Sequence, residues 1–160
     1  MKMTLNTVEQ SLATLAGMHR LLQNIQNGTN YSKKRNISYD INGAGGEIAV
    51  AKYFKVYPDL STGPHRRGHD LTVDGSTIDV KATTYNPGYL QCKTYKQVTD
   101  ADWYVLVHAH FPEYTIIGCA PAEELLQDHN IKDMGYGPVY HLEQSQLYSI
   151  KQMSNDNLPF

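Results

Sequence analysis

Apolar residues at the start of the chain recur at helical spacing. Between residues 5 and 27 they fall at intervals of three, four or seven residues, close to helical spacing, and Asn27-Gly28 supplies a stop signal. The stripe consists of Leu5, Val8, Leu12, Leu15, Leu22 and Ile25. The spacing predicts an amphipathic helix within residues 1–28. We expect this helix to pack on the core, with pairing to a second subunit as the alternative.

The stretch from Asp70 to Lys81 has the two-residue period of a β-hairpin. Asp74-Gly75 is a signal for a type I′ turn between strand-like residues. The turn predicts four cross-strand pairs: Val73–Ser76, Thr72–Thr77, Leu71–Ile78 and Asp70–Asp79. One face then carries Leu71, Val73, Ile78 and Val80, and the other carries Asp70, Thr72, Thr77, Asp79 and Lys81. A slip of one residue would mix these faces, so the pattern supports the register.

The remaining pattern predicts a mixture of helices and strands. Residues 41–56 read as a helix capped by Asp40 or Asn42, and the apolar run 103–109 suits a central strand buried on both faces. We further expect a loop over 28–39, a turn over 84–88, a strand over 114–119, a short helix over 120–126 with Pro121 at its first position, a loop over 130–138, edge strands over 139–142 and 147–151, and a frayed end.

The polar hairpin face contains a carboxylate pair. Asp70 and Asp79 are predicted to face each other, and like charges directly opposite destabilise a hairpin. A divalent cation would remove that repulsion. Two carboxylates, water and a backbone carbonyl, here that of Val80, suit Mg²⁺, with Mn²⁺ as a substitute. Lys81 on the same face reaches toward a phosphate or a metal-held water, as in phosphodiester hydrolysis. The alternative is a solvated face with scattered charges.

A third acid precedes the hairpin. Glu47 lies near the start of the predicted helix 41–56, next to small residues at 43–46, which suggest close approach to another element. The acid either joins the carboxylate site or only complements the helix dipole.

These residues together resemble the PD-(D/E)XK nuclease superfamily, which includes restriction-endonuclease-like and Holliday-junction-resolvase-like enzymes. The matching elements are a helix with Glu47, a strand with Asp70, and Asp79-Val80-Lys81 on the next strand; His69 stands where the motif has Pro. The resemblance covers residues 40–125 and leaves 130–160 as a C-terminal extension. It implies an α/β (α+β) core with a central mixed sheet of four to five strands flanked by helices, plus the extra N-terminal helix. It also implies that Asp70 and Asp79 bind metal, Lys81 positions or activates water, and Glu47 is an auxiliary acid that completes a metal site.

Gln91-x-x-x-Tyr95 is similar to a motif of RecB-type and lambda-type exonucleases in that superfamily. Gln91 and Tyr95 are therefore possible accessory residues. The alternative is that residues 89–93 form a short strand and that Tyr95 packs.

Composition indicates a single globular domain over residues 1–160. The apolar fraction is 41% and the charged fraction 19%, and there is no apolar run long enough for a transmembrane helix. The N-terminus is not a convincing signal peptide, and Cys92 and Cys119 lack metal-ligand spacing. We therefore expect an intracellular, cytoplasmic protein without organic cofactor or membrane partner. Zinc binding by His108 and His110 with His65 or His69 is a weaker alternative.

The net charge of −2 does not by itself indicate nucleic-acid binding. The basic residues are nevertheless grouped around the proposed site in the sequence, where they could contact phosphates. They are Lys33, Lys34, Arg35, Arg66, Arg67, Lys93 and Lys96.

The sequence thus favours a Mg²⁺-dependent DNA endonuclease. Its specificity, its oligomeric state and the choice between endonuclease, resolvase and exonuclease stay open, although two-strand cutting would favour a homodimer. The compact core would suit a phage-encoded protein. The main alternative is a non-catalytic or structure-selective nucleic-acid-binding module of the same fold, and a metal-dependent ribonuclease is a third.

Overall fold

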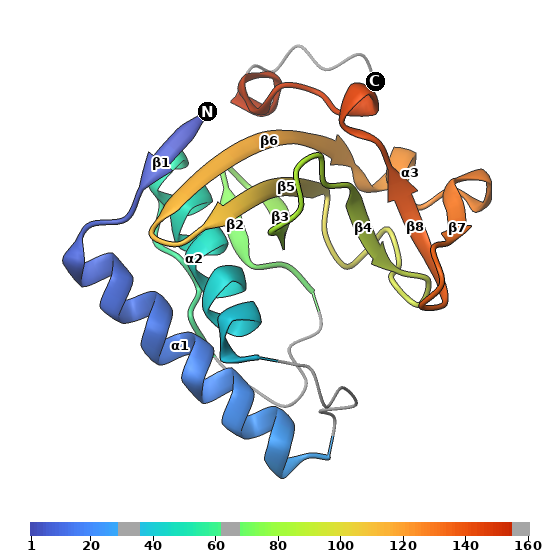
Figure 1. The fold of residues 1–160 in the computed structure, drawn as a ribbon. Coiled ribbons are helices and arrows are strands. Elements are labelled where there is room, and N and C mark those ends of the chain that lie inside the picture. The colour runs from blue at the N-terminus through green and yellow to red at the C-terminus, as the bar shows by residue number, and fades with distance from the viewer. Residues whose placement is uncertain (29–35, 62–67, 155–160) are drawn as a thin grey trace.

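The protein is an α+β fold in which two helices and a small sheet lie on opposite sides of a larger, curled sheet (Figure 1). The computed structural model describes residues 1–28, 36–61 and 68–154. The helices are α1 (Thr7–Gln26), α2 (Ile37–Phe54) and α3 (Ala122–Leu125). The strands are β1 (Lys2–Thr4), β2 (Leu71–Val73), β3 (Ser76–Thr83), β4 (Leu90–Lys93), β5 (Trp103–His110), β6 (Glu113–Pro121), β7 (Ile131–Asp133) and β8 (Pro138–Leu142). Short 3₁₀ turns occupy Asp128–Asn130, Gln144–Gln146 and Ile150–Ser154.

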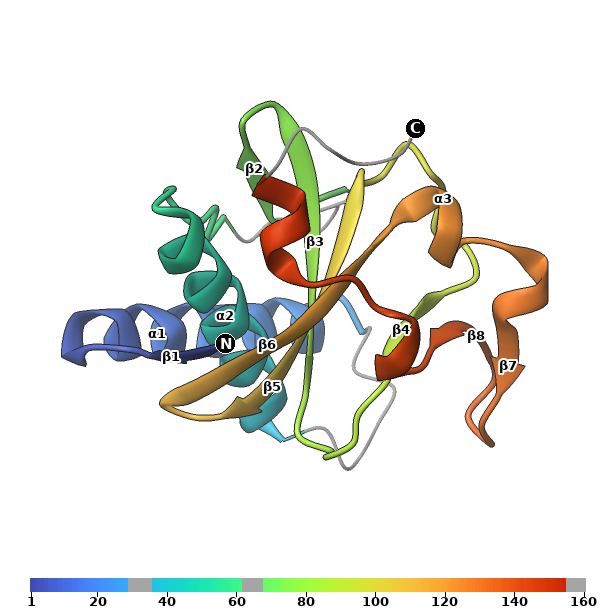
Figure 2. The same cartoon turned by 90° about the horizontal axis from the view of Figure 1, so that it is seen from above.

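The larger sheet is mixed and has five strands in the order β1-β6-β5-β3-β2. Strands β3 and β5 run parallel, and the other neighbours are antiparallel. The chain crosses from β3 to β5 through β4, which joins β8 and β7 in a separate three-stranded sheet (Figure 2). The expected mixed sheet of up to five strands with flanking helices is present, whereas the second sheet was not predicted.

Strand β5 is buried on both faces, as its continuous apolar run predicts. Trp103, Val105 and Val107 join the core formed with α2, while Tyr104 and Leu106 join the core beneath β4, β8 and α3. Asp79 and Lys81 of β3 pair with Tyr104 and Leu106. The side chains of Asp79 and Lys81 therefore face the second core and not α2.

The β2–β3 hairpin has the predicted turn and most of the predicted register. Asp74 and Gly75 both have positive φ angles, 48° and 87°, as a type I′ turn requires. Residues 71–73 pair with 76–78 as expected. The pairing departs from the prediction at Asp70, which lies just before β2 and not on a strand, and whose backbone N–H donates to the carbonyl of Ile78. The direct Asp70–Asp79 pair does not form because the backbone slips by one residue there.

Helix α2 begins earlier than predicted. The side chain of Asn36 caps it by accepting from the N–H of Ser38, so Asp40 and Asn42 lie inside the helix. The small residues allow the close approach that we expected. A Cβ on Gly45 would lie 1.9 Å from the hydroxyl oxygen of Tyr114, so only glycine fits at this crossing of α2 and β6.

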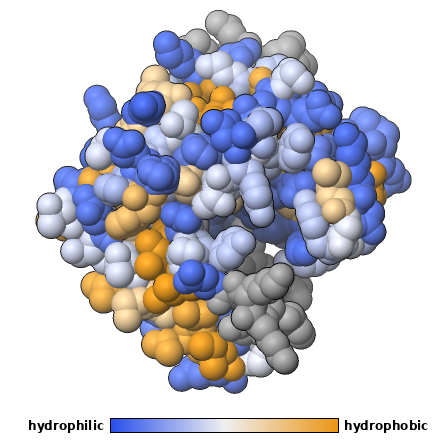
Figure 3. Space-filling model, in the orientation of Figure 1, coloured by the Kyte–Doolittle hydropathy of each residue, from blue (hydrophilic) through white to orange (hydrophobic). Residues whose placement is uncertain are grey.

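Helix α1 packs through the face opposite to the one that its apolar stripe predicts. Asn6 and Glu9 form a capping box at its start. Ala13, Ala16 and Gly17 are buried against α2, and a Cβ on Gly17 would lie 2.6 Å from the backbone nitrogen of Ile41. The stripe faces outward, and its apolar side chains are visible along the lower left of Figure 3, where α1 runs. The exposed members are Val8, Leu12, Leu15, Leu22 and Ile25, and Met18 lies among them. Leu5, the first member of the predicted stripe, is buried and precedes the helix.

Three expectations for the C-terminal part are wrong. Residues 131–133 form β7 inside the expected loop, and β8 is the central strand of the small sheet and not an edge. Residues 147–151 make a single bridge, Cys119–Tyr148, and the chain then turns into the 3₁₀ segment Ile150–Ser154 in place of a longer strand. Pro121 precedes α3 as its N-cap. In the described part of the chain, no helix has the length and apolarity needed to cross a membrane.

Candidate active site

The acidic residues singled out by the sequence are brought together at Asp70, at the entrance to the β2–β3 hairpin, where Glu47 and Asp79 each influence its carboxyl group. Asp79 and Lys81 lie on β3, Asp70 lies at the entrance to β2, and Glu47 lies on α2. Glu47 and Asp79 are both close enough to Asp70 to raise the pKa of its carboxyl group. Residues separated by up to 34 positions in the chain therefore share one electrostatic environment.

Asp79 is the most deeply buried of these acids, at 2% exposure. Two lysine ammonium groups neutralise it. Nζ of Lys96 donates to Oδ2 at 2.8 Å, and Nζ of Lys81 lies 2.5 Å from Oδ1. The contact with Lys81 lacks the direction of a hydrogen bond, so Oδ1 is buried without a hydrogen-bond partner. The charge of the carboxylate is therefore already neutralised by two lysines, and a metal ion could bind Oδ1 only in place of Lys81.

Asp70 has an unusual protonation equilibrium. Burial is the main cause that raises its pKa to about 7, and the negative charges of Glu47 and Asp79 add to the effect. Lys81 and the backbone N–H of Val80 act in the opposite direction, and that N–H donates to Oδ2 of Asp70 at 2.7 Å. The carboxylate of Asp70 is thus bound to the backbone N–H of the residue that follows Asp79 on β3.

Glu47 is held by Arg20 of α1. The two guanidinium nitrogens donate to the two carboxylate oxygens at 2.8 and 2.7 Å. Such a bidentate pair fixes the carboxylate in direction as well as in charge. Helix α1, which lies outside the resemblance, therefore supplies a residue to the site.

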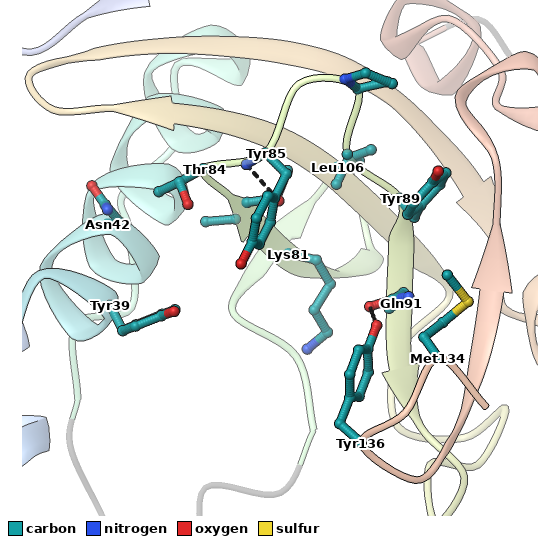
Figure 4. Close-up of a pocket in the computed structure, with 14 residues that line it drawn as sticks. Tyr39, Asn42, Lys81, Thr84, Tyr85, Tyr89, Gln91, Leu106, Met134 and Tyr136 are labelled. Carbon is teal, nitrogen blue, oxygen red and sulfur yellow. Dashed lines mark hydrogen bonds between the residues drawn. The ribbon is translucent and has the colours of Figure 1, made fainter. Parts of the chain in front are cut away.

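Lys81 is a cation at neutral pH. Burial, the largest influence, lowers its pKa, but Asp79 and then Asp70 outweigh that effect, so the pKa is raised. Its side chain is 30% exposed and points into a pocket, as Figure 4 shows. The ammonium group can therefore reach both Asp79 and a molecule in the pocket.

The pocket beside Lys81 has a volume of about 670 Å³. Its walls come from the start of α2, the end of β3, the 84–89 loop, β4 and the β7–β8 loop (Figure 4). Gln91 of β4 lies in this wall, whereas Tyr95 is 77% exposed and is not among the lining residues. Of the two members of the Gln-x-x-x-Tyr pattern, only Gln91 therefore lines the pocket. Residues 90–93 form a short strand, as the alternative interpretation predicted.

The basic residues expected to bind nucleic acid divide into three groups. Lys96 lies inside the site on Asp79, and Lys93 is exposed at the end of β4. The others, Lys33, Lys34, Arg35, Arg66 and Arg67, together with His65, lie outside the described residues.

The chemistry of Asp70 and Asp79 fits a divalent cation. The unsatisfied Oδ1 of Asp79 and the repulsion that raises the pKa of Asp70 are both features that a bound cation would relieve. Across residues 1–28, 36–61 and 68–154, no three His, Cys, Asp or Glu side chains are grouped to hold a metal ion. Glu47 is paired with Arg20, and both oxygens of Asp79 are paired with lysines. A cation held by Asp70, Asp79 and the Val80 carbonyl would therefore have to displace Lys81 from Asp79.

The sequence reasoning missed Arg20 and the role of Lys96 within the site. It also missed Tyr136 and His141, which hold Gln91: the hydroxyl of Tyr136 donates to Oε1 at 2.9 Å, and Nδ1 of His141 lies 3.0 Å from Nε2. None of these residues falls in a local motif. One available signal was Arg20 itself, a charge on the α1 face formed by Ala13, Ala16 and Gly17.

Comparison with protein-family models, with curated proteins and with solved structures finds no match to this chain.

Proposed function

We propose that the protein is a Mg²⁺-dependent DNA nuclease that hydrolyses phosphodiester bonds. The observation that carries the proposal is the Asp70–Asp79–Lys81 cluster, in which a buried aspartate with an unsatisfied oxygen adjoins a second acid and a protonated lysine beside an open pocket. The resemblance to the PD-(D/E)XK pattern suggests the same roles for these residues.

Each residue has a separate task in this proposal. Asp70 and Asp79 would hold the cation, which when bound supplies positive charge to the scissile phosphate and lowers the pKa of an attacking water. Lys81, protonated and facing the pocket, would bind a phosphate oxygen. Glu47 and Arg20 would keep the acidic cluster in position, because their bidentate pair joins α1 to α2 beside it.

The ion pairs of Asp79 favour a second candidate. Lys81 and Lys96 neutralise this carboxylate without any metal, an arrangement that also suits a protein that binds nucleic acid and does not cut it. The same experiment separates the two functions.

We expect Asp79→Asn to lower cleavage by more than about 100-fold, since even outer-shell partners of a metal site are worth 10–100-fold. Cleavage of single-stranded DNA, duplex DNA, a four-way junction and RNA would be measured with Mg²⁺, Mn²⁺ or EDTA. Asp74→Asn is the matched control, because it makes the same change in the turn of the same hairpin, where asparagine tolerates the positive φ.

Thermal unfolding of both variants would show that each is folded. Cleavage that requires metal, survives in Asp74→Asn and is lost in Asp79→Asn supports the nuclease. Equal binding of DNA by wild type and both variants without any cutting would refute it and support the binding module.

A further inference from the structure

The pocket beside Lys81 is lined by tyrosines. Tyr39 of α2, Tyr85 and Tyr89 of the 84–89 loop, and Tyr136 of the β7–β8 loop surround it, and Figure 4 shows Tyr39, Tyr85 and Tyr136 around the end of the Lys81 side chain. These four side chains are 40–73% exposed. Aromatic rings that stay open to solvent around a pocket offer faces on which a flat ligand can stack.

The polar groups of the pocket are already arranged. Gln91 is fixed at both ends of its amide by Tyr136 and His141, and the ring of His141 packs on Tyr89 with centroids 4.5 Å apart. Burial lowers the pKa of His141, which keeps the ring neutral and able to accept a hydrogen bond from the Gln91 amide. On the opposite wall, Asn42 presents a second amide. Amide groups can both donate to and accept from the edge of a nucleobase.

The single charge and the volume of the pocket suit the base of a nucleotide better than its phosphate. Lys81 is the sole charged side chain among the described residues that line the pocket. A volume of about 670 Å³ is within the range of pockets that enclose a small planar molecule. A base in a duplex is stacked on its neighbours and cannot enter such a pocket, whereas an unpaired base can.

We propose that this tyrosine-lined pocket binds an unpaired nucleobase of single-stranded DNA, with an adjacent phosphate on Lys81. The inference rests on the proposed nuclease function for its substrate and defines the substrate class as DNA with unpaired nucleotides. Stacking on Tyr85 or Tyr39 would supply most of the affinity, and Gln91 and Asn42 would contact the base edge.

The test is binding of DNA in EDTA, where a metal-dependent nuclease cannot cut. Fluorescence of a single-stranded oligonucleotide containing 2-aminopurine and the anisotropy of end-labelled single strand and duplex would be recorded. We expect the single strand to bind at least about tenfold more tightly than the duplex and to quench 2-aminopurine, as stacking does. Tyr85→Ala should weaken single-strand binding by about tenfold, whereas Tyr57→Ala, a 95% exposed tyrosine outside the pocket, should not change it.

The outcomes separate this inference from the nuclease proposal. Tyrosine-dependent binding of single strands without cleavage under any metal would support the pocket and refute the nuclease. Metal-dependent cleavage with equal affinity for single strand and duplex, and with no effect of Tyr85→Ala, would overturn the pocket and leave the nuclease standing. Equal losses in Tyr85→Ala and Tyr57→Ala would also overturn it.

Discussion

Arg20→Ala should lower the free energy of unfolding by about 3 kcal/mol, the usual cost of removing one partner from a buried ion pair. The Arg20 side chain is 17% exposed and the Glu47 side chain 7% exposed, and their charged groups are joined by two short hydrogen bonds. Loss of Arg20 removes the cation that pairs with Glu47, while the negative charge of Asp70 stays close by. The repulsion between these acids then adds to the lost hydrogen bonds.

Urea unfolding would measure this loss, with Lys52→Ala as the matched control. Lys52 also bridges α2 to an acid near the start of α1, Glu9, at 2.8 Å, but its side chain is 36% exposed. An exposed pair of this kind contributes at most about 1 kcal/mol. If the two substitutions cost the same, the bidentate pair has no special role in holding α1 on α2.

The hairpin could be predicted because its information is local. Asp74-Gly75 determines the turn, the turn determines the register, and the alternation of apolar residues indicates which face is buried. The position of Asp70 could not be predicted in the same way. Its N–H donates to the carbonyl of Ile78 one residue out of register, and its carboxylate accepts from the N–H of Val80, so side-chain chemistry competes with the ladder.

The orientation of α1 shows a limit of periodicity. A stripe of leucines identifies an apolar face but does not say which element covers it. The helix instead uses Ala13, Ala16 and Gly17 against α2, because small residues let the two backbones approach closely. That choice leaves the leucines outside and brings Arg20 to Glu47, 27 residues further along the chain. Neither segment alone contains the information that these two side chains meet.

The lysines around Asp79 show a second limit. Strand alternation places Lys81 on the same face as Asp79, as predicted, but the ion pair between the two side chains was not predicted. Lys96 comes from the turn after β4, and its position depends on how the crossover from β3 to β5 folds. Long-range packing of this kind places Lys96 on the carboxylate and Gln91 in the pocket wall, while Tyr95 remains outside.

The stability of the protein in EDTA should fall as the pH rises from about 4 to about 7. The pKa of Asp70 is raised to about 7 in the folded state, mainly by burial and then by Glu47 and Asp79, whereas it is about 3.9 in the unfolded chain. Between these values the folded state binds more protons, so the stabilisation is complete below about pH 4 and is lost as the pH rises through 7. At about 1.4 kcal/mol per pH unit, the loss is at most about 4 kcal/mol.

Urea unfolding of wild type and Asp70→Asn across this pH range provides the measurement. The difference between the two proteins isolates Asp70, because it cancels the opposite contribution of His141, whose pKa is lowered by burial and whose stabilisation grows as the pH rises toward 6.5. The amide in the variant cannot titrate, so the wild type should lose stability relative to it from pH 4 to 7. Parallel curves would show that Asp70 ionises normally and that the acids repel one another less than their positions indicate. A wild type that gains stability relative to the variant would mean that Lys81 and the Val80 N–H hold Asp70 as a stable anion, with a pKa below its usual value.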